Sequence, residues 1–104
     1  MNVRFFDDHL EKFIRNLERR TIARVLRTID LLELFGNELG MPHSRKIGGR
    51  LLELRVRGQQ EVRILYVFHK DRAVLLHGFV KKSQKMSRRV LQLTQQKLRV
   101  LDSI

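Results

Sequence analysis

The stretch LLELRVRGQQEVRILYVFHKDRAVLLHGFV, residues 51–80, predicts three antiparallel strands and decides the fold. Its first run, 51–57, alternates between apolar and charged residues, as a half-buried strand does. The second run, 62–69, is rich in the β-branched and aromatic residues that strands prefer. A short turn at 70–72 makes a hairpin with the third run, 73–80, which is almost continuously apolar. Such a run is typical of a central strand covered on both faces.

The residues before this stretch predict a short strand and two helices. Residues 2–6 read as the strand, and Asp7 or Asp8 can then cap the first helix. A second helix begins near Arg20 or Thr21, and Gly36 is a natural end for it. Its apolar residues recur with the helical period and are expected to face inward: Ile22, Val25, Leu26, Ile29, Leu32 and Phe35.

After a linker at 37–42 and the strand stretch, the chain predicts a last helix. Ser87 can cap this helix, which presents Val90, Leu91, Thr94, Leu98 and Leu101 inward. Helices and strands segregate along the sequence rather than alternate, which indicates an α+β fold. We expect one domain over 1–104, with an N-terminal strand and helical hairpin packed on a small antiparallel sheet, plus a C-terminal helix.

Charge is distributed unevenly between the two parts of the chain. Residues 1–42 contain 7 Lys+Arg and 7 Asp+Glu, whereas residues 43–104 contain 15 Lys+Arg and 4 Asp+Glu. The whole net charge of +11 therefore lies in the strand-rich part. A neutral scaffold joined to a basic half predicts a surface for a polyanion, most simply nucleic acid.

Composition excludes several other classes of protein. The chain has no cysteine, so disulfides and thiol nucleophiles are excluded, and its 4 histidines lack metal-ligand spacing. We therefore expect no metal and no cofactor. No run of about 18 apolar residues is present, so we expect no membrane span and a cytoplasmic location.

Strand alternation groups three charged residues on one face of the sheet. Leu52, Leu54 and Val56 are expected to face the helices, which places Glu53, Arg55 and Arg57 on the opposite, open face. If Ile64 also faces the helices, Arg63 lies on the open face with these charged residues. An arginine in the middle of a strand is costly unless it is solvated or paired. The ordinary alternative is a cross-strand salt bridge from Glu53 to Arg63 or Arg55.

The densest basic run, Lys81-Lys82-Ser83-Gln84-Lys85, follows the most apolar strand directly. It leads into a helix whose first turn carries Arg88 and Arg89, although cations oppose the helix dipole there. Basic side chains beside free helix N–H groups suit a phosphate. Two alternatives to a phosphate site remain open: the run is a solvated loop, or it is a surface for an acidic protein partner.

Three further residues each have a functional and a structural interpretation. His77, in an apolar strand, is either catalytic or a hydrogen-bonded core histidine. Tyr66, the only tyrosine, either stacks on a base or fills the core. Lys46 either reaches a phosphate or is ordinary surface.

The segments LLELRVRG (51–58), EVRILYVFH (61–69) and VLLHGFVKKSQK (74–85) resemble the phage-related, HigB-like branch of the RelE/ParE toxin superfamily. DDHLEKFIRNL (7–17) and LFGNELGMPHSRKI (34–47) are similar to that branch as well. The resemblance implies the toxin of a type II toxin–antitoxin pair, with a helix-turn-helix antitoxin as partner. Such toxins bind the ribosomal A site and cut mRNA without metal.

The resemblance also implies roles for individual residues. Arg63 matches the strand arginine that holds the scissile phosphate, and Lys81 and Lys82 match basic residues at the end of the last strand. Glu53 or His77 remains open as the general base, with Tyr66, His77 or a lysine as the acid. The expected RNA contacts are Arg55, Lys46, Tyr66, Lys85, Arg88 and Arg89.

Two other functions remain open at this point. A ParE-like toxin of the same fold would poison DNA gyrase, with the basic region serving a protein target. An inactive relative would bind nucleic acid without cutting it.

Overall fold

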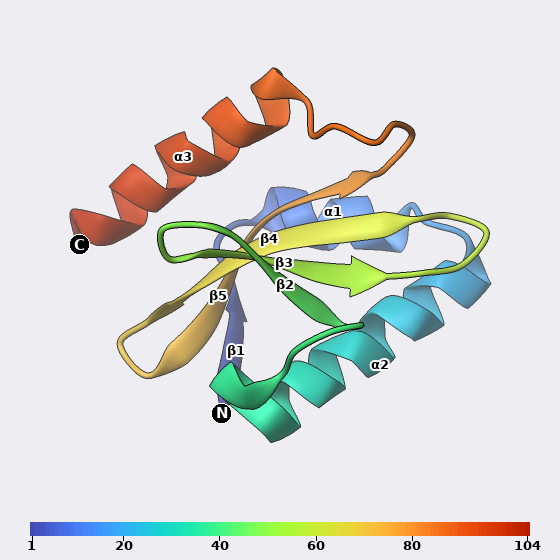
Figure 1. Ribbon diagram of the computed structural model, residues 1–104, viewed down its shortest axis with the longest axis horizontal. Helices are drawn as coiled ribbons and strands as arrows, with labels where there is room; N and C mark the ends of the chain where they lie inside the picture. Colours follow the sequence, from blue (N-terminus) through green and yellow to red (C-terminus); the bar gives the residue numbers. More distant parts are fainter.

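The computed structural model describes residues 1–104 and has the predicted α+β architecture (Figure 1). It contains three helices, one short 3-10 turn and five strands. In chain order these are β1 (Asn2–Phe5), α1 (Asp8–Arg15), α2 (Arg19–Phe35), η1 (Gly36–Glu38), β2 (Ser44–Gly48), β3 (Leu51–Val56), β4 (Val62–His69), β5 (Arg72–Val80) and α3 (Arg88–Asp102).

The five strands form one sheet in the order β1-β5-β4-β3-β2. The three strands predicted from 51–80 are its antiparallel centre. β1 pairs in parallel with β5, so the sheet is mixed rather than wholly antiparallel. β2 was not predicted as a strand, because its sequence SRKIG is short and mostly polar; it joins the edge of the sheet by pairing with β3.

Local signals in the sequence account for the ends of several elements. The Asp7 carboxylate accepts a hydrogen bond from Leu10 N and caps α1, and Ser87 Oγ accepts one from Val90 N and caps α3. Lys70 and Asp71 both have positive φ, 51° and 61°, as the tight turn between β4 and β5 requires. These caps and this turn confirm the predicted positions.

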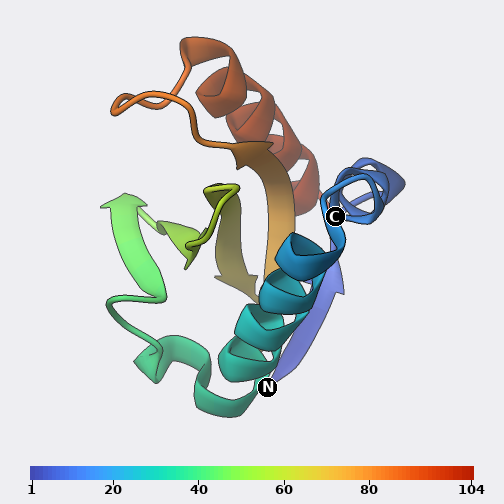
Figure 2. The same ribbon diagram turned by 90° about the vertical axis from the view of Figure 1, so that its right-hand side faces the viewer.

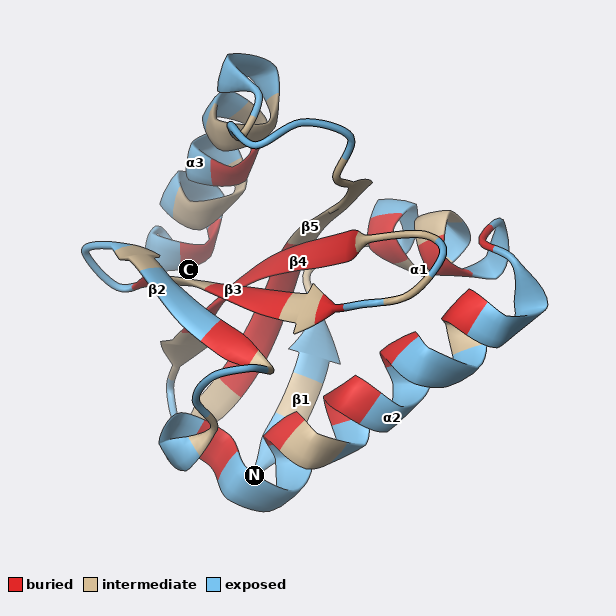
Figure 3. Cartoon of the chain, turned by 45° about the vertical axis from the view of Figure 1, so that its right-hand side comes forward, coloured by how far each residue is buried: buried red, intermediate tan, exposed pale blue.

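Helices cover both faces of the sheet (Figures 1 and 2). On one face, α1 and α2 pack on a core that includes Leu54, Ile64 and Leu75. On the other face, α3 packs through residues such as Leu98 and Leu101 on a smaller cluster. The strand members of that second cluster are Leu51, Leu65, Val67, Val74 and Leu76. The predicted alternation of β3 and β4 is confirmed, and the central strands are the most buried part of the chain (Figure 3).

Two inward positions predicted for α2 are wrong. Leu26 is 50% exposed and Phe35 is 48% exposed. The buried stripe of α2 is narrower than the hydrophobic pattern, and it runs through Val25, Ile29 and Leu32. Leu26 and Phe35 lie at the two borders of this stripe, since each is offset from Val25 or Leu32 by roughly 60–100° around the helix.

Candidate functional site

The sheet face toward α3 is apolar at one end of its strands and charged at the other. Cross-strand pairing brings Arg55, Arg63 and Phe79 into one row across β3, β4 and β5. Beyond the strand ends, Lys81 N donates a hydrogen bond to Glu61 O at 2.6 Å, so Glu61 and Lys81 add one more row of charged residues at this end. α3 therefore covers an apolar end of this face, and charged residues gather at the other end.

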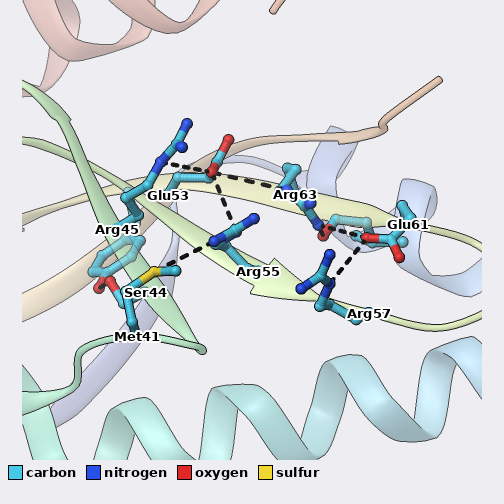
Figure 4. A network of polar contacts seen from close by, with 10 residues as sticks. Met41, Ser44, Arg45, Glu53, Arg55, Arg57, Glu61 and Arg63 are labelled. Carbon is cyan, nitrogen blue, oxygen red and sulfur yellow. Dashed lines mark hydrogen bonds and ion pairs between the residues drawn. The ribbon is translucent and has the colours of Figure 1, made fainter. Parts of the chain in front are cut away.

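Glu53 lies at the centre of this charged end (Figure 4). Its Oε1 atom is 3.7 Å from Arg45 Nε, 3.8 Å from Arg55 Nε and 3.8 Å from Arg63 Nε. The cross-strand salt bridges considered from the sequence are therefore present. The expectation of an open, solvated face is wrong for two of the residues, because Glu53 and Arg63 are each only 2% exposed.

This cluster contains more positive than negative charge. Three guanidinium groups surround one carboxylate, and the 3.7–3.8 Å separations are too long for hydrogen bonds. Arg55 Nε, Arg63 Nε and Glu53 Oε1 are all buried without a hydrogen-bond partner. A buried polar group without a partner costs about 1–3 kcal/mol. The cluster is therefore unfavourable in the free protein and has donors to offer an anion.

A pocket of about 340 Å³ opens beside the cluster. Arg63 lines it, with Nη1 donating to Glu61 Oε2 at 3.2 Å and to Val62 O at 3.1 Å. Its lining contains five cationic side chains and one carboxylate, and no hydrophobic residue. The lining residues are Arg55, Arg57, Glu61, Arg63, Lys81, Lys82, Ser83 and Gln84. We call this the arginine–lysine pocket; its charge suits a phosphodiester.

His77 does not lie in the arginine–lysine pocket. It is two strands away from Glu53, with Leu65 between them, and its Nδ1 is 3.3 Å from Lys97 Nζ. Lys97 Nζ also donates to Leu76 O at 2.9 Å and pairs with the Asp7 carboxylate at 3.1 Å. Burial and the nearby charge of Lys97 lower the pKa of His77. The structural interpretation of His77 is the one that this geometry supports.

Lys97 also controls the ionisation of Asp7. Partial burial acts to raise the pKa of Asp7, but the hydrogen bond and charge of Lys97 outweigh it and lower this pKa below its usual value. The contact joins the start of α1 to α3 and so links elements on the two faces of the sheet.

Tyr66 and Lys46 also lie outside the pocket. Tyr66 is 1% exposed on the face toward α1 and α2, where its hydroxyl contacts Ser44 Oγ at 2.5 Å. Burial raises the pKa of Tyr66, although the Ser44 hydrogen bond acts in the opposite direction. Tyr66 therefore fills the core and cannot stack on a base in this arrangement. Lys46 is exposed opposite Leu52 on the edge strand, and its neighbour Arg45 is the residue beside Glu53.

The rest of the basic run surrounds a second hollow. This space of about 200 Å³ shares Lys81, Lys82 and Ser83 with the arginine–lysine pocket and adds Lys85. Arg88 and Arg89 are exposed at the start of α3 and line neither space.

Two residues of the site, Arg45 and Glu61, were not expected from the sequence, and Arg57 was expected on the open face but not as a functional residue. Glu61 has the same alternation as Arg63, so strand parity could have identified it. Arg45 had no such signal, because β2 was not predicted as a strand and its pairing with Glu53 was therefore hidden.

Neither a metal-binding cluster nor a membrane-spanning helix is present. No group of three or more His, Asp or Glu side chains converges in an arrangement that could hold a metal ion. None of the helices combines the length and apolar character needed to cross a membrane.

Comparison with known proteins identifies the family. No curated protein matches the chain significantly. A family profile described as "Phage derived protein Gp49-like (DUF891)" matches residues 12–99, which include the second half of α1, all of α2, all of the arginine–lysine pocket and most of α3. The chain therefore belongs to the phage-derived Gp49-like family, a RelE/ParE-like toxin family of toxin–antitoxin systems.

Proposed function

We propose that this chain is a toxin that cuts mRNA on the ribosome without a metal ion, and that a helix-turn-helix antitoxin holds it inactive. One observation supports the nuclease over other toxin activities. Three guanidinium groups, of which that of Arg63 is buried, converge on the buried Glu53 carboxylate, beside an open pocket lined by five cations. Such an arrangement is costly when empty and favourable around the extra charge of a phosphate under attack.

The reaction that fits this pocket is attack of an RNA 2′-oxygen on the adjacent phosphorus. The new bond joins the 2′-oxygen to phosphorus, and the bond from phosphorus to the 5′-oxygen breaks. A base takes the 2′-proton and an acid protonates the leaving 5′-oxygen, which gives a 2′,3′-cyclic phosphate and a 5′-hydroxyl. Arg63 and Arg55 stabilise the charge that develops on the non-bridging oxygens.

Glu61 takes the role of base in this proposal. Its side chain is 35% exposed, lines the pocket and accepts a hydrogen bond from Arg63 Nη1. Glu53 is enclosed by three arginines and is placed to orient them rather than to reach a 2′-hydroxyl. Since Tyr66 and His77 lie outside the pocket, Lys81 or Lys82 supplies the proton to the 5′-oxygen.

The central test is the substitution of Arg63. In cells, induction of the wild type is expected to arrest growth and to produce discrete cuts inside reading frames, mapped by primer extension. Arg63→Ala and Arg63→Lys are expected to abolish the cuts, because lysine keeps the charge but lacks the fork of donors that matches a phosphate. Arg99→Ala, at an exposed residue of α3, is the matched control. Altered DNA supercoiling without mRNA cuts would overturn the proposal in favour of a gyrase inhibitor.

A second test concerns the ribosome. The pocket is open and offers few groups for acid–base chemistry, so we expect the ribosome to orient the RNA. Purified protein should therefore cut mRNA during translation in vitro much faster than the same RNA alone. Equal rates on the two substrates would exclude the ribosome-dependent part of the proposal.

A further inference from the structure

A second basic pocket lies on the other side of β3, between this strand and α2. Its volume is about 240 Å³, and its charged lining consists of Arg24 and Arg27 from α2 and Arg55 and Arg57 from β3 and its end, with His43 beside them. No carboxylate lines it. These positive charges therefore have no compensating partner within the pocket.

The α2 arginines are arranged in a row. Arg20, Arg24 and Arg27 have the spacing i, i+4, i+7, which places them on one side of a helix. Arg20 and Arg24 line a smaller hollow that also includes Gln59 and one carboxylate, Glu18, so the row continues along the turn between β3 and β4. Neither Arg24 nor Arg27 forms a salt bridge.

Arg24 is held in place by the turn that follows β3. Its Nη1 donates to Arg57 O at 3.1 Å. Its guanidinium lies directly against Gly58, where a Cβ atom would collide with it. A glycine at 58 thus permits Arg24 to lie on this turn, and the guanidinium stays beside the pocket.

The arginine–lysine pocket and the pocket between β3 and α2 are continuous with each other. Arg55 and Arg57 line both of them. β2 pairs with β3 only as far as Leu54, apart from one hydrogen bond from Arg55 N to His43 O, so the last part of β3 is an edge around which a chain can pass. A polyanion in the arginine–lysine pocket can therefore extend across this edge to α2.

We propose that the row of Arg20, Arg24 and Arg27 is a phosphate-binding extension of the site, which holds the RNA backbone beyond the scissile phosphate. The inference rests on the proposed function, since it takes RNA as the occupant of the arginine–lysine pocket. The continuity of the two pockets favours one RNA strand over an acidic protein segment bound at α2 alone. The neutral N-terminal part of the chain thereby contributes directly to RNA binding.

Binding of non-cleavable RNA tests this proposal without requiring cleavage. The probes are a 2′-O-methyl dinucleotide, which spans a single phosphate, and a longer 2′-O-methyl oligonucleotide. Arg24→Gln and Arg27→Gln should each weaken binding of the longer probe about two- to fivefold, the size of an exposed ion pair. Each should also lower the slope of log K against log salt by about 0.7, because one phosphate of a single strand is no longer neutralised by the protein. Dinucleotide binding should be unchanged.

Two controls separate position from total charge. Arg19→Gln removes the same charge at a residue about 100° around the helix from Arg20, and it should leave binding unchanged. Gly58→Ala keeps every charge but displaces the Arg24 guanidinium, and it should weaken the longer probe by less than Arg24→Gln does.

Two results would overturn the inference, and a third would overturn only the proposed function. Equal losses for Arg19→Gln and Arg27→Gln would show only the effect of net charge. Variants that bind RNA normally but no longer bind an acidic poly-glutamate probe would show that the row serves a protein partner. If the row variants lose RNA affinity as expected while the wild type cuts no RNA, the row is confirmed as an RNA site and the proposed nuclease function fails.

Discussion

The two ends of the sheet face toward α3 differ in what they bury: one end buries apolar side chains and the other buries charged ones. At one end Leu51, Leu65, Val67 and Leu76 pack against α3 and contribute stability through burial of apolar surface. At the other end Arg63 and Glu53 are equally buried, yet three guanidinium groups share one carboxylate without hydrogen bonds. The same strands therefore carry an apolar end that stabilises the fold and a charged end whose buried polar atoms lack hydrogen-bond partners. The charged end is the one suited to an anion.

The largest effect is expected when the only carboxylate of the cluster is removed. Glu53→Gln removes the carboxylate that the three guanidinium groups share and leaves Glu61 as a negative partner of Arg63 alone; breaking a buried ion pair costs about 3–5 kcal/mol of unfolding free energy. Urea denaturation measures the change. Glu61→Gln, at a half-exposed carboxylate, is the control and should cost about 1 kcal/mol or less. Equal losses for both variants would show that Glu53 does not hold the charged end together.

A cavity in the apolar end of this sheet face is expected to lower the free energy of unfolding. Leu76 is 0% exposed and packs in the cluster under α3, so Leu76→Ala is expected to lose about 2–5 kcal/mol of unfolding free energy. Mutation of Leu34, which is 75% exposed, to alanine should change it by about 0.5 kcal/mol or less. RNA cleavage per folded molecule should stay at the wild-type level in Leu76→Ala. A loss of cleavage beyond the loss of folded protein would show that the two ends are coupled.

Removal of one excess cation should separate stability from activity. Arg63→Met replaces a buried guanidinium by an apolar side chain of similar length, and the remaining Arg45 and Arg55 still face Glu53. Exchange of a whole buried ion pair for apolar groups is often neutral or stabilising, and Glu53 is not left uncompensated here because two cationic partners remain. We expect an unchanged or higher melting temperature together with loss of mRNA cleavage. A fall in stability comparable to that of Glu53→Gln would show that Arg63 is needed for folding rather than for the reaction.

The smallest effect concerns pH and the contact between His77 and Lys97. The folded state lowers the pKa of His77 below 6.5, so near pH 6 the unfolded chain binds more protons than the folded one. This contribution to stability is present above pH 6.5 and is lost as pH falls through the folded pKa. Denaturation at a series of pH values should show the decline, and His77→Gln should make it shallower. An identical decline in both proteins would mean that His77 is not its source.

The sequence predicted most of the fold because its local signals were strong. The alternation in 51–57, the turn at Lys70-Asp71 and the caps at Asp7 and Ser87 each depend on residues close together in the chain. β1 was predicted as a strand, but its parallel partner β5 is set by contacts between distant parts of the chain. β2 was missed because an edge strand this short and polar has no hydrophobic period to detect.

The site was predictable in part for the same reason. Strand parity placed Glu53, Arg55 and Arg63 on one face of the sheet. It could not show that Glu53 and Arg63 are buried, nor that Leu65 lies between His77 and Glu53 and that His77 contacts Lys97 instead. Side-chain alternation reports the face of a strand, whereas burial depends on what packs upon that face.

The parallel pairing of β1 with β5 has a consequence for how the protein is synthesised. Asn2 pairs with Arg72 and Phe5 with Leu75, so the first strand to be translated has no partner until the last strand of the sheet has been made. Pairings this distant in sequence form late in folding, after the local helices and hairpins. Lys81 and Lys82 follow β5 directly, so the pocket and the closed sheet become complete at nearly the same moment. A ribosome that has not yet translated β5 therefore carries a chain without a finished arginine–lysine pocket.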